Sequence, residues 1–424
     1  MTYRPLLTNN MQRGLANNPR QRASVTKYVE RVFNPNIPFS KKPNARYGPA
    51  VFHAIMMGAA ALGVSIFGYT AAARRWKTIS YKLIRGHREY PCGEWISNIC
   101  MRVDPYGMAK SLENVMSANL DRLQSLGLLA GKQIDIAIDM HLIQRWDRKH
   151  GAELVRSKSK GKTGSFERYI TAQCIKPGMQ MALALFHMPA LEDTACYVRK
   201  TIAMCRQTGA KIGTVMLDRE FFSTDVIRVL EDLGVDYLIP CVNTANVIRA
   251  IEEFYRGERP AISVFRIAKS KNDYVEYVLH ITKRTKKRKK KSKSCVEKPE
   301  EKYIAFATNR FDIDVKRYSE RWMIETGFRM IENQRVRTRS RSVNVRTLCF
   351  MYSLVLYNSW VLANAELTNN PSVSGGVYSK VTQTDMKIII MMHILPWICK
   401  YEKPPPRVSL DGSKDVTRHD IFYM

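Results

Sequence analysis

Two short strand-like runs that each end on an aspartate constrain the fold of this chain most strongly. Residues 133–139 and 212–218 are largely apolar segments that finish on Asp139 and Asp218. A third acidic residue, Glu325, lies in a segment with helical spacing. These carboxylates can converge only if the two strands are neighbours and the helix packs across them. The sequence therefore predicts an α/β fold with one acidic site.

The charge balance indicates what that acidic site would act on. The 424 residues include 68 Lys and Arg against 38 Asp and Glu, which gives a formal net charge of +30. Such an excess favours a polyanionic partner, with nucleic acid preferred over an anionic membrane surface. Two divalent cations about 3.5–4 Å apart can stabilise both oxygens of a phosphodiester displacement, and they need shared carboxylates. We therefore expect a metal-dependent site that works on nucleic acid.

One apolar stretch raises the question of a membrane. Residues 47–73 contain no Lys, Arg, Asp or Glu and are long enough to span a bilayer. They are rich in Ala, Gly and Met, so a buried helical pair is preferred and a membrane span is the alternative. We expect no membrane partner. The first 50 residues lack the pattern of a signal peptide, and nine cysteines without a C-x-x-C pair indicate reduced thiols and no zinc.

At residue 131 the chain changes from helical spacing to strands that alternate with helices. We expect strands at 133–139, 166–175, 179–187, 212–217, 236–241, 262–267, 274–281 and 303–308, and helices at 111–128, 191–207, 223–233 and 347–367. The predicted organisation is a flexible basic arm (1–45), a helical DNA-binding region (46–130), a catalytic domain in two parts (131–242 and 304–367), a β-rich insertion with a lysine-rich loop (243–303) and a C-terminal tail (368–424). An insertion is expected because 106 residues separate Asp218 from Glu325, which is long for a bare connection.

Three blocks carry a family resemblance. Ala137–Ile143, Leu217–Ser223 and Tyr318–Glu325 resemble the three signature blocks of DDE transposases from prokaryotic insertion sequences. The third block is similar to the group that reads Tyr-x-x-Arg-x-x-x-Glu-x-x-x-x-x-x-Lys. The resemblance covers about residues 130–365. It implies a ribonuclease H-like mixed sheet flanked by helices, and a protein that cuts the ends of a DNA element and transfers the 3′-OH into target DNA.

By this match, Asp139, Asp218 and Glu325 would be the catalytic residues and the ligands of two Mg²⁺ or Mn²⁺ ions. Asp135 competes with Asp139, because alternate residues of a strand share one face. Asp139 is preferred, since it fits the family block better and polar side chains follow it. Asp147 is a less favoured third candidate.

The third block also implies contacts with DNA. Tyr318 and Arg321 match the Tyr and Arg of the motif, and their spacing from Glu325 places them on one helical face. The Lys position of the motif holds Glu332, which is a departure. Arg329 or Arg335 could replace the missing lysine.

Other basic residues are further candidates for DNA binding. The segment Ala59–Ser65 resembles the turn of a helix-turn-helix, with plain helical packing as the alternative. Its second helix would direct Thr70, Arg74, Arg75 and Lys77 toward DNA. Arg219 could orient phosphate or form an ordinary surface turn.

Two lysine-rich segments complete the predicted DNA contacts. Lys158, Lys160 and Lys162 are expected in a loop after the first strand. The loop of the insertion carries Lys286, Lys287, Arg288, Lys289 and Lys290. It is expected to bind phosphate, with a nuclear localisation signal or a solvated loop as alternatives. Residues 161–163 lack the glycine that a Walker loop needs, so no nucleotide cofactor is expected.

The predicted protein is therefore an insertion-sequence transposase. We expect it to be prokaryotic, cytoplasmic and nucleoid-associated, and to act as a homodimer or higher oligomer on double-stranded DNA, both element ends and target. The alternative is a catalytically inactive, transposase-derived DNA-binding protein.

Overall fold

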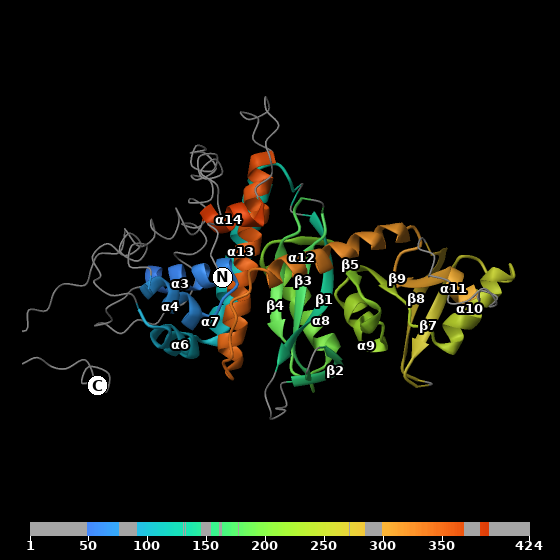
Figure 1. Cartoon of the computed structure of the whole chain (residues 1–424). Helices are drawn as coiled ribbons and strands as arrows, with labels where there is room; N and C mark the ends of the chain where they lie inside the picture. Colours follow the sequence, from blue (N-terminus) through green and yellow to red (C-terminus); the bar gives the residue numbers. More distant parts are fainter. Residues whose placement is uncertain are drawn as a thin grey trace, which may run out of the picture.

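The structure, a computed structural model, describes residues 49–75, 91–129, 131, 133–145, 154–160, 163–176, 178–270, 272–284, 299–368 and 382–389. At its centre is a mixed sheet of nine strands (Figure 1). Their order is β2-β3-β1-β5-β6-β9-β8-β7. The ninth strand, β4, pairs with a different part of β3 from the part that pairs with β2. The strands are β1 (Gln133–Arg145), β2 (Leu154–Lys160), β3 (Thr163–Cys174), β4 (Ala182–His187), β5 (Lys211–Leu217), β6 (Asp236–Pro240), β7 (Ile262–Ala268), β8 (Tyr274–Lys283) and β9 (Tyr303–Thr308).

Five of these strands form the core of the sheet, in the order β4-β3-β1-β5-β6. β1, β5 and β6 are parallel to one another, whereas β3 is antiparallel to both of its neighbours β1 and β4. Only β3 therefore runs against the other four. This arrangement confirms the expectation of an α/β fold with a ribonuclease H-like mixed sheet.

β1 is longer than its sequence pattern predicts. The expected strand ended at Asp139, but β1 continues to Arg145 because β3 pairs with it as far as Arg145↔Ser165. Its parallel neighbour β5 stops earlier, and the last parallel pair is Ile138↔Leu217. The prediction that Asp139 ends a strand is therefore wrong, although Asp218 does follow the end of β5.

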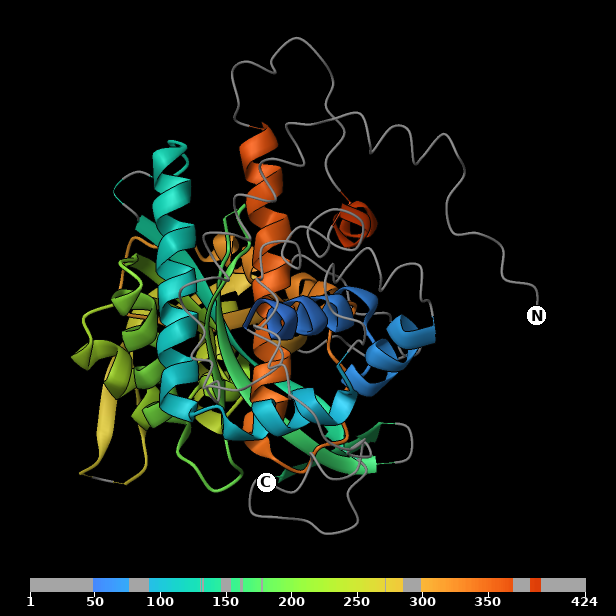
Figure 2. The same ribbon diagram turned by 90° about the vertical axis from the view of Figure 1, so that its left-hand side faces the viewer.

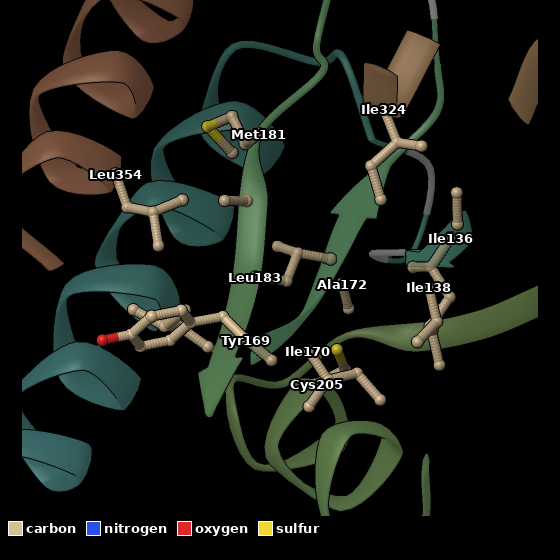
Figure 3. Close-up of a cluster of buried hydrophobic side chains, with 14 of the residues drawn as sticks. Ile136, Ile138, Tyr169, Ile170, Ala172, Met181, Leu183, Cys205, Ile324 and Leu354 are labelled. Carbon is tan, nitrogen blue, oxygen red and sulfur yellow. The ribbon is translucent and has the colours of Figure 1, made fainter. Parts of the chain in front are cut away.

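Side chains of β3 alternate between two helical layers. Figure 3 shows Tyr169 on the side of α13 (Val343–Thr368) and Ile170 on the side of α8 (Thr194–Gln207), near Ile138 and Cys205. Because strand side chains alternate, the residues of β1 also divide between the two faces. α9 (Thr224–Asp232) packs against α8, and its predicted cap is confirmed, since the Ser223 hydroxyl accepts from the Val226 N–H.

The other face carries the long helices. α7 (Pro105–Ser125) and α13 contact each other and both contact β4, and they stand side by side in Figure 2. α13 is long and apolar enough to cross a membrane by length and composition, but 89% of its most apolar window is buried inside the protein. It is the central helix of the core.

The apolar segment near the N-terminus forms two helices, α3 (Pro49–Leu62) and α4 (Ile66–Arg75), followed along the described chain by α6 (Gly93–Arg102). α3 packs on α13 and buries most of its side chains, including Phe52. The two helices also pack on each other, which confirms the predicted helical pair, but only α3 is buried, since Phe67 of α4 is 57% exposed. The turn between the two helices uses Gly63 at φ 64°, a conformation that favours glycine.

Residues 243–303 contribute to the same sheet. β7 and β8 join it through β9, which lies beside β6. The segment also contains α10 (Ala245–Tyr255), a helix that the strand-rich pattern did not predict, and the short α11 (Pro299–Lys302). α10 and these strands form the end of the molecule opposite α3 and α4 (Figure 1).

Candidate active site

Asp139 and Asp218 lie on neighbouring strands where the parallel pairing ends. Asp139 follows the last β1–β5 pair, and Asp218 is the first residue after β5. Each carboxylate accepts a hydrogen bond from the next backbone N–H, at 2.8 Å from Met140 and 2.6 Å from Arg219. The register of β1 and β5 places both aspartates at the same level of the sheet, and the local bonds orient their carboxylates.

Arg321 connects the three predicted acidic residues. Its guanidinium donates to Asp139 Oδ2 at 3.0 Å and to Glu325 Oε1 at 2.9 Å, and it lies 3.8 Å from Asp218 Oδ2. The arginine side chain is only 10% exposed, compared with 16% for Asp139, 40% for Asp218 and 58% for Glu325. The acidic residues are therefore gathered around one cation, and Asp139 is the least accessible of them. Burial raises the pKa of Asp139, and the charge of Arg321 opposes that shift.

The segment that carries Arg321 and Glu325 is fixed to the end of β5. It consists of a 3-10 turn, η3 (Val315–Arg321), that leads directly into α12 (Trp322–Glu332). The Tyr318 hydroxyl donates to the Leu217 carbonyl at 3.0 Å, one residue before Asp218. Burial raises the pKa of Tyr318, so the phenol keeps the proton that this bond needs. Tyr318, Arg321 and Glu325 lie on one face as predicted, but Tyr318 and Arg321 belong to the 3-10 turn η3 and only Glu325 to the α-helix.

Asp135, the rival of Asp139, has a different set of contacts. β5 bulges opposite Asp135, and the Asp135 carboxylate accepts from the Thr214 N–H at 2.7 Å and from Arg317 at 2.5 Å. A Cβ on Gly213 would lie 2.5 Å from Asp135 Oδ1, so glycine is needed for this approach. Asp135 thus stabilises the β1–β5 junction and η3, and Arg317 is a contact that the sequence analysis missed.

The acidic cluster suits a divalent cation by its chemistry. Carboxylate oxygens are the ligands that Mg²⁺ prefers, and here they already converge on a cationic group, the guanidinium of Arg321. Within the described residues, no three acidic, histidine or cysteine side chains are grouped closely enough to hold an ion as they stand. A cation would therefore enter only as Arg321 gives up its contacts or Glu325 reorients.

Glu332, which replaces the lysine of the motif, has partners of its own. It lies 2.9 Å from His141 Nε2 and 3.2 Å from Arg335 Nε. Burial by itself would raise the pKa of Glu332. The hydrogen bond with His141 and the charge of Arg335 outweigh burial, so the pKa is lowered. The His141 ring also packs against Phe328 of α12, with centroids 4.7 Å apart. The acidic side chain therefore attaches the end of α12 to β1.

Gly327 allows α12 to approach the sheet. A Cβ at this position would overlap the side-chain amide of Gln173, which is held by the Gln180 carbonyl at 2.8 Å and the Tyr357 hydroxyl at 2.9 Å. In an open helix, alanine would be favoured over glycine by about 1 kcal/mol. At position 327 the overlap with Gln173 outweighs this gain, so alanine is expected to destabilise the protein.

Gly327→Ala is therefore expected to lower the free energy of unfolding by about 1–3 kcal/mol, measured by urea denaturation. Arg329→Ala, at an exposed position of the same helix, is the control and should change it by less than about 0.5 kcal/mol. Equal stability of Gly327→Ala and the wild type would show that α12 does not depend on this close contact.

Several predicted DNA contacts are only partly placed. Lys158 and Lys160 lie in β2 rather than in a loop, because β2 pairs with β3 up to Lys160↔Thr163. Arg74 and Arg75 end α4, but their side chains, like those of the two lysines, are outside the described part. Lys77, Lys162, Lys286, Lys287, Arg288, Lys289, Lys290 and Asp147 fall outside the described residues.

The structure corrects two expectations about surface and core. Thr70 does not face outward, since it is 2% exposed and its hydroxyl donates to the Ile66 carbonyl at 3.0 Å. The helical spacing of Trp322 with Ile324, Phe328 and Ile331 predicts a packed position for its side chain, but Trp322 is 60% exposed beside Arg321. Arg219 lies in the 3-10 turn after Asp218, and its buried Nε has no hydrogen-bond partner among the described residues.

The chain resembles known proteins in sequence and in fold. A family model described as "Transposase DDE domain" matches residues 148–359, half of the chain. This segment contains Asp218 and Glu325 but begins after Asp139. None of the curated proteins matches the chain. The fold is similar to that of a piggyBac transposase in a cryo-EM structure of its synaptic complex with hairpin DNA, with a TM-score of 0.50, 11% identity, and coverage of 93% of this chain and 81% of that one.

Proposed function

Because the chain belongs to the DDE transposase family, we propose that it cleaves the DNA backbone at the ends of a mobile element and transfers the 3′-OH ends into target DNA. The observation that carries the proposal is the convergence of Asp139, Asp218 and Glu325 on the guanidinium of Arg321. Carboxylates from two adjacent strands and a crossing helix supply the oxygen ligands that metal-assisted phosphodiester chemistry needs.

The three acidic residues would hold Mg²⁺ or Mn²⁺, two ions in the expected arrangement. Bound cations of this kind polarise the phosphate and lower the pKa of the attacking water or hydroxyl. The protein's own residues provide the positions. Asp139 is fixed within β1, whereas the exposed Glu325 has room to reorient. Once displaced from the carboxylates, Arg321 would offer its fork of donors to a phosphate oxygen.

The test is cleavage of a plasmid that carries the terminal repeats of the element, with and without Mg²⁺. Asp218→Asn removes one negative charge but keeps an oxygen that can accept from the Arg219 N–H. We expect metal-dependent cleavage by the wild type and a loss of more than about 100-fold in the variant, because losing even a supporting group around a metal costs about 10–100-fold. DNA affinity, measured by fluorescence anisotropy, should be retained by the variant.

The second candidate function is DNA binding without catalysis. The replacement of the motif lysine by Glu332 is the feature that favours it, yet Glu332 has a structural role through His141 and Arg335. Equal DNA binding and no cleavage by both proteins, with Mg²⁺ or Mn²⁺, would establish this function instead.

The partner we propose is double-stranded DNA, with two element ends held by a dimer or higher oligomer. The fold neighbour was solved as a synaptic complex with hairpin DNA, and synapsis requires two ends. The mass of this protein bound to a single DNA end and to paired ends, measured by light scattering, would give the number of chains in each complex. The proposed location is the nucleoid of a prokaryotic cytoplasm, where such DNA lies.

A further inference from the structure

A basic groove lies beside the candidate active site. It has a volume of about 1500 Å³ and is bordered by the α3–α4 turn, the end of β1 and the segment that follows α12. Glu167 is the single acidic residue among the lining side chains. Five arginines line the groove, namely Arg145, Arg335, Arg337, Arg339 and Arg346. A groove with this excess of guanidinium groups suits a phosphate backbone.

The segment after α12 has a regular pattern that the proposed catalytic site does not use. Residues 335–341 read Arg-Val-Arg-Thr-Arg-Ser-Arg. Val336 is buried, while Arg337, Arg339 and Arg341 are exposed. This alternation is the period of an extended chain, in which every second side chain faces the same way. We call residues 335–341 the arginine ladder.

The ladder is held in place at both ends. Near its start, the Arg337 N–H donates to the Val64 carbonyl at 3.1 Å, and Arg337 Nε donates to the Gly63 carbonyl at 3.0 Å. Near its end, Arg145 and Arg346 each donate to the Ser340 carbonyl at 3.1 Å. A basic segment that is already ordered loses little conformational entropy on binding.

The arginines in and around the ladder differ in whether an acidic side chain already pairs with them. Arg335 is paired with Glu332, and Arg346 with Glu167. By contrast, no ion pair joins Arg339 or Arg341 to an acidic side chain in the described part of the chain. Their guanidinium groups are exposed and free to bind phosphate.

The distance from the acidic cluster to the groove defines which phosphates Arg339 and Arg341 would bind. β1 runs from Asp139 to the groove, where residues 143–145 form part of the lining. Four to six strand residues at about 3.3 Å each span about 13–20 Å. With about 3.4 Å per nucleotide along a DNA strand, this corresponds to about four to six nucleotides.

We propose that the arginine ladder binds the phosphate backbone of the DNA about four to six nucleotides from the bond that is cut, with Arg339 and Arg341 as the principal contacts. The inference rests on the proposed function and adds a second, sequence-independent binding site to it. Phosphate contacts of this kind fix the register of the DNA without selecting its sequence.

Salt dependence tests the ladder without any catalysis. Arg339→Gln/Arg341→Gln should reduce the slope of log K against log salt by about 1.8, since each lost phosphate contact contributes about 0.9. The reduction should be the same for element-end DNA and unrelated duplex. The control is Arg199→Gln/Arg206→Gln, which removes equal charge from α8, on the opposite face of the sheet; its slope should match the wild type. A slope unchanged in the ladder variant, or equally reduced in both, would overturn the inference.

Position is tested with methylphosphonate linkages, which remove one phosphate charge at a time from an element-end duplex. Wild-type affinity should fall most for substitutions about four to six nucleotides from the cut, and the ladder variant should not respond there. If both proteins respond equally at those positions, or the wild type responds only elsewhere, the ladder does not bind this part of the DNA. Failure of the wild type to cut would refute the proposed function, whereas the salt slopes would still decide on the ladder as a phosphate site.

Discussion

Asp139→Asn is expected to lower single-turnover DNA cleavage by more than about 100-fold, whereas Asp135→Asn should leave it within about tenfold. The two residues lie four apart on one face of β1. Asp139 belongs to the cluster around Arg321 and is a proposed metal ligand, and losing a direct ligand should cost more than losing a group that only supports one. Asp135 instead binds Arg317 and the Thr214 N–H, and asparagine can still accept from that N–H.

The pair is a matched comparison, because each change replaces one carboxylate by an amide of the same shape. Both proteins should stay folded, with circular dichroism spectra equal to that of the wild type. The Asp135–Arg317 pair is partly exposed, at 28% and 40%, so its loss should cost at most about 1 kcal/mol. The reverse result, with Asp135→Asn inactive and Asp139→Asn active, would move the reacting centre along β1 and contradict the proposed site.

Glu167→Gln is expected to lower the free energy of unfolding by about 3–5 kcal/mol. Glu167 and Arg346 form an ion pair with side chains only 2% and 5% exposed. Removing the carboxylate charge leaves a buried guanidinium without its counter-ion. His187 lies 3.8 Å from Glu167, but burial, aided by the charge of Arg346, lowers the pKa of His187 to about 4. The histidine is therefore neutral near pH 7 and does not compete with Arg346 for the charge of Glu167. Urea denaturation measures the effect.

The double variant Glu167→Gln/Arg346→Met is the control for this prediction. Replacing both partners removes the unpaired charge, so part of the lost stability should return. The arginine ladder should still be loosened, because Arg346 also donates to the Ser340 carbonyl. A single variant that loses less than about 1 kcal/mol would mean that water reaches this pair and screens its charge.

Local sequence patterns gave most of the secondary structure. The apolar runs of β5, β6, β8 and β9 and the spacing of α8 and α9 were recognisable within a few residues, since period and capping are properties of short segments. β2 and α10 were missed. The polar, lysine-rich sequence of β2 is typical of a loop, and pairing with β3 overrides it.

Sequence by itself determined the charge of the chain, its helical and strand-rich halves, and three acidic residues in blocks that resemble a known family. Only the tertiary structure decided that β1 continues past Asp139, that Asp135 stabilises the β1–β5 junction, and that Arg337 and Arg339 border a groove at the end of β1. The physical reason is the range of the interactions. Periodicity and caps depend on neighbours within a few residues. The partner strand, the guanidinium shared by residues 139, 218 and 325, and the anchors of the ladder come from segments up to 274 positions apart, and only folding brings them together.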